Sequence, residues 1–136
     1  MTQSMANVPS VAAAVIVQEG RVLMVRRRVS EGQLSWQFPA GKVEPGESRE
    51  AAAVREAREE TGLRVAAAKL LGERIHPMTG RLISYTACEV EGGVAHLTTT
   101  EEVAEVAWVT HGDIPQYVPY GLFEPVQEHL DAVLPS

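Results

Sequence analysis

Cysteine is nearly absent from this 136-residue chain, since Cys88 is the only one. No disulfide can form within the chain, which is typical of proteins in a reducing cytoplasm. Cys88 lies in the apolar run ISYTACEV (83–90). We expect it to be a buried strand residue rather than a reactive thiol.

Long apolar runs and an excess of basic residues are also missing. No run reaches the roughly 18 apolar residues of a membrane-spanning helix, and MTQSMANVPS (1–10) lacks the basic start and apolar stretch of a signal peptide. Twelve Lys and Arg face 18 Asp and Glu, for a net charge of −6. Non-specific nucleic-acid binding needs a basic face. We therefore expect a soluble cytoplasmic protein with no nucleic-acid or membrane partner.

What the chain does contain is enough apolar sequence for a core. Its apolar content is 45%, and its length is that of one domain. We predict a flexible N-terminus over 1–10 and a single domain over 11–136. The sequence does not decide between a monomer and a homodimer.

The order of apolar patterns and turn signals predicts strands, a helix, more strands and a final helix. This order indicates an α+β fold, a mixed sheet with helices packed on it. Ser48 is a plausible N-cap of the first helix, and Gly62 is placed to cap its end at Thr61. Pro125 suits the first turn of the last helix. The strands are predicted at 11–18, 21–26, 36–38, 70–75, 81–90, 94–97 and 104–109, with a loop at 29–35 and a turn at 91–93.

Glutamates crowd the first helix, most densely in REAREE (55–60). Glu56, Glu59 and Glu60 are spaced i, i+3 and i+4, so they share one stripe beside the apolar face of Ala53, Val54 and Ala57. Like charges this close repel one another and raise one another's pKa values. A solvated acidic surface helix is one reading of the pattern. A bound cation is the other.

Carboxylates alone select a hard ion such as Mg²⁺ or Mn²⁺. Arg55 stands four residues before Glu59 and can orient it. Glu47 can reach back from the preceding loop, and the small residues Ala40 and Gly41 leave space for a backbone carbonyl to approach the same ion.

The complete stretch from 41 to 63 resembles the signature of the Nudix hydrolases. The fixed glycines and charged residues of that signature are all present, and WQFPAGK before it and EVAWV (105–109) are similar to the family's flanking segments. The resemblance implies a mixed β-sheet sandwiched between α-helices, an α/β/α sandwich. The matching positions are Gly41, Glu47, Arg55, Glu56, Glu59, Glu60 and Gly62, with Ala57 and Leu63 at the apolar positions.

The resemblance also implies a reaction. Nudix hydrolases cleave a nucleoside diphosphate linked to another group, with Mg²⁺ or Mn²⁺ and an attacking water. Glu56, Glu59 and Glu60 are then metal ligands, with the Ala40 carbonyl as an addition. Glu47 is an outer or second-ion ligand, and Arg55 orients the glutamates.

A glutamate outside the signature often acts as base or extra ligand in this family. In relatives of the MutT type it lies six residues before the tryptophan of the late strand, which is Trp108 here. That position is Glu102, with Glu101 as a second candidate. The alternative is that both are ordinary loop charges.

Other residues are candidates for holding the substrate. Arg26 or Arg27 can clamp a phosphate with forked donors, unless they form a solvated strand end. Three aromatic residues are candidates for contact with the base: Trp36, Tyr85 and Phe123.

The base itself is not specified. MutT-type enzymes that cleave oxidised guanine nucleotides read the base with an asparagine before the last helix, and Asn7 is the only asparagine in this chain. We predict cleavage of a common or modified (d)NTP to the monophosphate and pyrophosphate. The alternatives are hydrolysis of ADP-ribose or a nucleoside diphosphate sugar, to which the position of Pro77 points, and a non-catalytic nucleotide-binding module.

Overall fold

The computed structural model describes residues 10–28, 34–77, 80–98 and 103–135. Its first element is the predicted hairpin of β1 (Val11–Gln18) and β2 (Arg21–Arg28). Glu19 and Gly20 both have positive φ, 51° and 77°. Such a turn matches the right-handed twist of paired strands, which is why two residues suffice. The N-terminus predicted to be flexible lies outside the described residues, except for Ser10.

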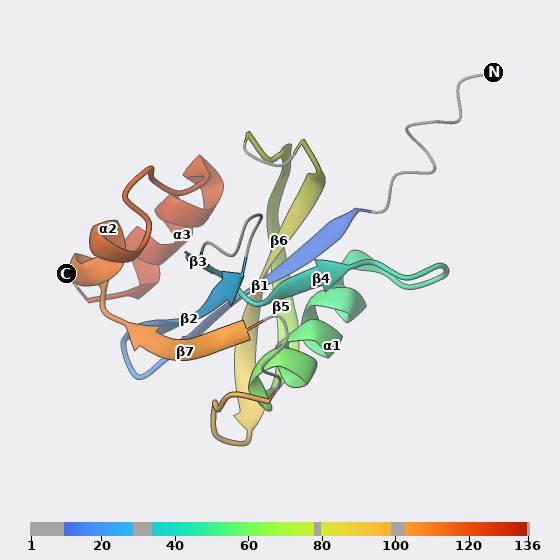
Figure 1. The fold of residues 1–136 in the computed structure, drawn as a ribbon, viewed down its shortest axis with the longest axis horizontal. Coiled ribbons are helices and arrows are strands. Elements are labelled where there is room, and N and C mark those ends of the chain that lie inside the picture. The colour runs from blue at the N-terminus through green and yellow to red at the C-terminus, as the bar shows by residue number, and fades with distance from the viewer. Residues whose placement is uncertain (1–9, 29–33, 78–79, 99–102, 136) are drawn as a thin grey trace.

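The strands form one mixed sheet (Figure 1). β1 pairs in parallel with β6 (Leu82–Gly92), whereas its pairing with β2 is antiparallel. The main path runs β3-β2-β1-β6-β5, with β4 paired to β1 and β7 paired to β2. The remaining strands are β3 (Leu34–Gln37), β4 (Ala40–Lys42), β5 (Arg64–Ile75) and β7 (Val103–Val109).

Helices cover both faces of this sheet. In Figure 1, α1 (Arg49–Thr61) lies on one side, and α2 (Ile114–Tyr117) and α3 (Glu124–Val133) lie on the other. β1 is buried on both faces because its alternate residues enter two cores. Ala12, Ala14 and Ile16 pack with α1, and Ala13 and Val15 pack with the side of α3. The predicted α+β sandwich is therefore confirmed.

The boundaries of α1 are those the sequence predicts. The Ser48 side chain accepts a hydrogen bond from the backbone N–H of Ala51 at 3.0 Å. At the other end, Gly62 adopts φ 79° and its N–H donates to the Arg58 carbonyl at 2.9 Å. Ala53 and Ala57 are fully buried, so small side chains bring the helix close to the sheet. The caps place the glutamates at fixed heights above β4 and β1.

Several predicted boundaries are wrong. β5 begins at Arg64 rather than at residue 70, and β6 includes residues 91 and 92 of the predicted turn. The segment 94–97 is not a strand, because the His96 N–H bonds to the Thr61 carbonyl at the end of α1. Residues 40–42 form a strand although Pro39 and Gly41 suggested a break. The short helix α2 and the 3₁₀ turn η2 (His111–Asp113) before it were not predicted.

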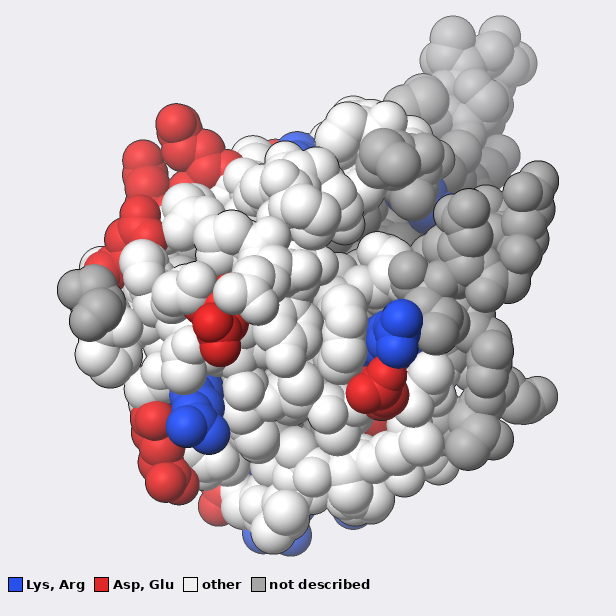
Figure 2. Space-filling view, turned by 60° about the vertical axis from the view of Figure 1, so that its left-hand side comes forward, with Lys and Arg blue, Asp and Glu red and all other residues white. Residues whose placement is uncertain are grey.

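Cys88 is 5% exposed in β6, as predicted for a strand residue of the core. Burial raises the pKa of its thiol to about 12, which keeps it protonated at neutral pH. Among the described residues, no helix has the length and apolar character needed to cross a membrane. The face toward α2 and α3 is largely uncharged in Figure 2, with acidic residues gathered at one edge.

Loss of the N-cap should weaken α1 without affecting its packing. We expect Ser48→Ala to lower the free energy of unfolding by about 1 kcal/mol, because the Ala51 N–H loses its acceptor. Ser48→Asp keeps an acceptor and suits the helix dipole, so it should retain nearly wild-type stability. Urea unfolding of the three proteins measures both effects. Equal losses for alanine and aspartate would contradict the capping role.

Candidate active site

The three glutamates of REAREE lie on one edge of α1 at different depths. The Glu60 side chain is 6% exposed, Glu56 is 13% exposed, and Glu59 is 58% exposed. The predicted stripe therefore runs from the core to the solvent. Its inner end points toward β4 and β2, where only a matching positive group can compensate a buried carboxylate.

Arg55 holds the outer part of this edge together. Its Nη1 lies 2.8 Å from Glu56 Oε2 and 3.2 Å from Glu59 Oε1. Its Nε and Nη2 both bond Glu47, at 2.8 and 2.9 Å, and Nη2 also donates to the Lys42 carbonyl at 2.9 Å. The contact with Glu59 is the one predicted from the i, i+4 spacing. One guanidinium thus joins two glutamates of the helix to one of the loop.

This contact shifts the ionisation of both partners. The hydrogen bond from Arg55 lowers the pKa of Glu47 to about 2, helped by the Glu44 N–H. The pKa of Arg55 is raised by the same bond. Glu56 differs, because burial raises the pKa of its carboxyl. Arg55 opposes that shift, while the charges of Glu60 and Glu59 add to it. Burial therefore disfavours the charged form of Glu56.

Glu60 has its own cation. Arg27 Nη2 lies 2.6 Å from Glu60 Oε1 and 3.2 Å from the Ala40 carbonyl oxygen. The Ala40 N–H also donates to Glu60 Oε1, at 3.2 Å. Arg27 was predicted to bind phosphate, and in this structure it orients Glu60 and the start of β4.

Gly41 leaves the space in which the Glu56 carboxylate sits. A Cβ at this position would overlap all three heavy atoms of that carboxylate. Gly41 has no positive φ, so the close approach, rather than the backbone conformation, requires glycine there. The signature glycine therefore has a direct steric role.

The donor set suits a hard divalent cation. All five predicted ligands offer oxygen. Burial, and after it the charges of Glu60 and Glu59, raise the pKa of Glu56, and a cation beside it would favour its charged form. Across the described ranges, no three His, Cys, Asp or Glu side chains surround a single cation position. Arg55 and Arg27 instead form ion pairs with the carboxylates. The predicted ligands are Ala40, Glu47, Glu56, Glu59 and Glu60.

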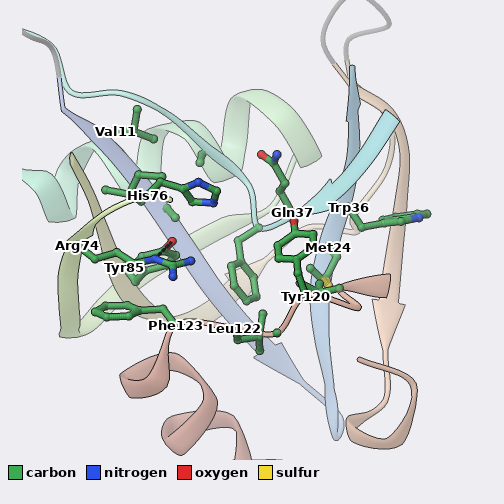
Figure 3. Close-up of a pocket in the computed structure, with 16 residues that line it drawn as sticks. Val11, Met24, Trp36, Gln37, Arg74, His76, Tyr85, Tyr120, Leu122 and Phe123 are labelled. Atoms are coloured by element: carbon green, nitrogen blue, oxygen red, sulfur yellow. Dashed lines mark hydrogen bonds between the residues drawn. The ribbon is translucent and has the colours of Figure 1, made fainter. Parts of the chain in front are cut away.

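A pocket of about 90 Å³ adjoins this edge on the other side of β4 and is open to solvent. Ala40 lines it and also bonds Glu60. Figure 3 shows Arg74, Tyr85 and Phe123 together at one end and Gln37 and Trp36 at the other. Most of the remaining lining is apolar or aromatic, including Met24, Phe38, Tyr120 and Leu122.

The predicted substrate residues fall in different places. Trp36, Tyr85 and Phe123 line the pocket, and Trp36 makes an edge contact with Tyr117 at 4.9 Å. Arg26 instead bonds Glu105 at 2.7 Å, with both side chains well exposed. Glu101 and Glu102 lie outside the described residues, so the role of a base there stays a prediction.

Sequence reasoning missed the polar residues of the pocket. Arg74, His76 and Gln37 all line it. Burial and the nearby Arg74 lower the pKa of His76. Strand alternation gives a signal for Arg74, since Gly72 and Arg74 share one face of β5 and Gly72 pairs with Tyr85 of β6.

The family is decided by comparison with known proteins. A model of the NUDIX domain matches residues 6–130. The chain belongs to the Nudix hydrolases. Members of this family act on pyrophosphate bonds of nucleotide substrates and generally use divalent metal ions.

Curated Nudix relatives match most of the chain. A CTP pyrophosphohydrolase of Escherichia coli strain K12 is 34% identical over 108 residues, 79% of each chain. A putative 8-oxo-dGTP diphosphatase of Bacillus subtilis strain 168 is 34% identical over 104 residues, 76% of this chain and 67% of that protein. Their names differ in substrate, so similarity at this level does not name one.

Solved structures agree with the fold. The solution structure of the E. coli ORF135 protein is 30% identical, with a TM-score of 0.66 over 92% of this chain and 87% of that one. A MutT Nudix hydrolase of Burkholderia pseudomallei is 26% identical, with a TM-score of 0.69 over 92% and 97%.

Gly41 and Gly46 form a matched pair of test positions. We expect Gly41→Ala to lower kcat/KM for pyrophosphate hydrolysis by about 100-fold, because the new methyl group displaces the Glu56 carboxylate. The free energy of unfolding should change little, since a flexible carboxylate can move.

Gly46→Ala should behave in the opposite way. Gly46 has φ 80° and no neighbour within 4 Å of a Cβ, so alanine there costs about 1 kcal/mol of stability and leaves hydrolysis intact. Steady-state kinetics and urea unfolding separate the two effects. Equal activity in both variants would contradict the role of Gly41.

The ion pair of Glu47 should make stability depend on pH. The pKa of its carboxyl is lowered from 4.5 to about 2 in the folded protein. Its contribution is therefore complete above pH 4.5 and is lost as the pH falls toward 2. The difference in unfolding free energy between wild type and Glu47→Gln should narrow over that range in urea titrations. Glu128→Gln, an exposed change on α3, controls for the loss of one charge. A constant difference between wild type and Glu47→Gln would count against the pairing.

Proposed function

We propose that this Nudix hydrolase cleaves a common or modified (d)NTP to the nucleoside monophosphate and pyrophosphate, with Mg²⁺ or Mn²⁺ bound at the acidic edge of α1. The observation that carries the proposal is the position of Ala40. Its backbone contacts Glu60 and Arg27, and the same residue lines the aromatic pocket. A base in the pocket would therefore have its phosphates beside the glutamates.

The aromatic lining of the pocket supports a nucleotide base. Tyr85 and Phe123 have ring centroids 5.4 Å apart with planes inclined at 41°. Aromatic faces stack on any base, while a free phosphate gains nothing from them. The phosphates belong on the other side of Ala40.

The chain supplies the oxygen ligands for the cation. Glu56, Glu59 and Glu60 would hold it, with the Ala40 carbonyl and Glu47 as further oxygen donors. A bound divalent cation would supply positive charge to the phosphate oxygens and would activate water for attack. Binding of the cation requires the side chains of Glu56 and Glu59 to turn away from Arg55. Arg55 keeps its two hydrogen bonds to Glu47. Arg55 is thus a positioning residue.

A carboxylate must take the proton of the attacking water. Glu102 is our candidate for this base, on the resemblance to MutT-type enzymes. Arg26, exposed beside Glu105, and Arg27, bonded to Glu60, remain our candidates for a phosphate contact. Trp36, Tyr85 and Phe123 would contact the base.

Relatives support triphosphates over other substrates. The two curated relatives described above are named for a nucleoside triphosphate each, and they align with 79% and 76% of this chain. RNA pyrophosphohydrolases, such as that of Pectobacterium carotovorum, match only 41% of the chain and 30% of their own length. The similarity to an ADP-ribose pyrophosphatase of Streptococcus suis, at 23% identity, supports only the fold.

The test is hydrolysis with Mg²⁺ of a panel of common and oxidised (d)NTPs, ADP-ribose and nucleotide sugars, with products identified by mass. We expect monophosphate and pyrophosphate from a triphosphate. Glu59→Gln should reduce kcat by about 100-fold. Because the Glu59 side chain is exposed, the substitution should leave the stability of the fold unchanged. Glu60→Gln should do the same, although it also weakens the buried pair with Arg27. Glu128→Gln on α3 is the control.

Other outcomes assign the site differently. Turnover of ADP-ribose alone would replace the triphosphate proposal with the sugar-nucleotide alternative. Nucleotide binding without turnover of any substrate would indicate a non-catalytic module. Unchanged rates in both glutamate variants would contradict the metal assignment.

A further inference from the structure

Arg74 is the one arginine among the described lining residues of the pocket. Its side chain comes from the end of β5 and lies beside Tyr85 and Phe123 (Figure 3). The preceding residue, Glu73, lies on the opposite face of the strand and pairs with Arg49 at the start of α1. Strand alternation therefore sends Glu73 to the helix and Arg74 into the pocket.

The guanidinium is held in place by its neighbours. Its carbon lies 5.0 Å from the centroid of the Phe123 ring and 5.8 Å from that of Tyr85, within the range of cation–π attraction. Arg74 Nε also donates to the Tyr85 hydroxyl at 3.3 Å. Gly72 makes room for this arrangement, because a Cβ there would lie 3.1 Å from the Phe123 ring. A guanidinium bound on several sides is a preorganised donor.

Arg74 has N–H donors that are not used within the described residues. A guanidinium has five N–H groups and no acceptor, and within the described parts of the chain its two terminal nitrogens have no hydrogen-bond partner. The surrounding rings favour a flat ligand that lies in the plane of the fork. A tetrahedral phosphate would match the charge, but it would leave the aromatic faces unused.

We propose that Arg74 determines base specificity by donating two parallel hydrogen bonds to a base edge with two adjacent acceptors. Cytosine offers O2 and N3, whereas uracil carries a hydrogen on N3. Guanine offers O6 and N7, whereas adenine has an amino group beside N7. The pocket should thus prefer cytosine to uracil and guanine to adenine. This inference rests on the proposed function only in taking the ligand to be a nucleotide.

Binding without metal tests the inference apart from hydrolysis. CMP, UMP, GMP and AMP are titrated in EDTA into wild type, Arg74→Lys and Arg74→Met, and Kd is measured by NMR. For wild type we expect CMP to bind about tenfold or more tightly than UMP, or GMP than AMP. The pair that shows the preference identifies the base that fits. Lysine keeps the charge but lacks the fork, so both variants should lose the preference.

Controls separate a reading role from a structural one. Arg64→Lys changes an exposed arginine on the same strand and should keep the wild-type preference. Near-UV circular dichroism reports on the aromatic wall, and the lysine variant remains informative if the methionine variant is disordered. An equal loss of affinity for all four nucleotides, or recovery of the preference with lysine, would assign Arg74 to phosphate or general charge and overturn the proposal. No preference in wild type would overturn it as well.

Failure of the proposed function gives a different result. A base preference in EDTA without hydrolysis of any triphosphate would refute the reaction and keep the role of Arg74. Hydrolysis of triphosphates with a base preference unchanged in Arg74→Lys would refute the role of Arg74 and keep the reaction.

Discussion

The crowding of carboxylates along one edge of α1 is the constraint on which the rest of the site depends. Four glutamates lie close together, and two arginines neutralise part of their charge. Arg55 comes from the helix itself, so its place follows from helical geometry. Arg27 comes from β2 and reaches Glu60 only because the sheet brings β2 and β4 beneath the helix. Folding and the charge balance of the site are therefore coupled.

The coupling depends on the central strand β1 and its three partners. β1 is apolar on both faces, and it pairs with β2, β4 and β6. The pairing with β4 fixes Ala40 and Gly41 under α1, where the first bonds Glu60 and the second makes room for Glu56. A three-residue strand thus determines where the two innermost glutamates lie. The strand β4 could not be predicted from residue propensities, because Pro39 and Gly41 are typical strand breakers.

The sequence predicted what depends on local spacing. The caps of α1, the hairpin turn and the contact between Arg55 and Glu59 are separated by few residues, so helical and turn geometry determine them. The complete signature also predicted the family. Contacts between distant segments were beyond its reach: the bond of Arg27 to Glu60 was not predicted, and Arg74 was overlooked. Such contacts depend on sheet register, which a single sequence does not specify.

The two faces of β1 divide the molecule into a side that carries the acidic helix and a side that carries the aromatic pocket. Glutamates gather over one core, and the aromatic pocket opens on the other. Ala40 is where the two meet. Substitutions along β5 or before α3 can reshape the pocket while the helix with its carboxylates keeps its packing. A fold divided in this way lets the sequence vary on one side of a strand while the acidic helix on the other side stays unchanged.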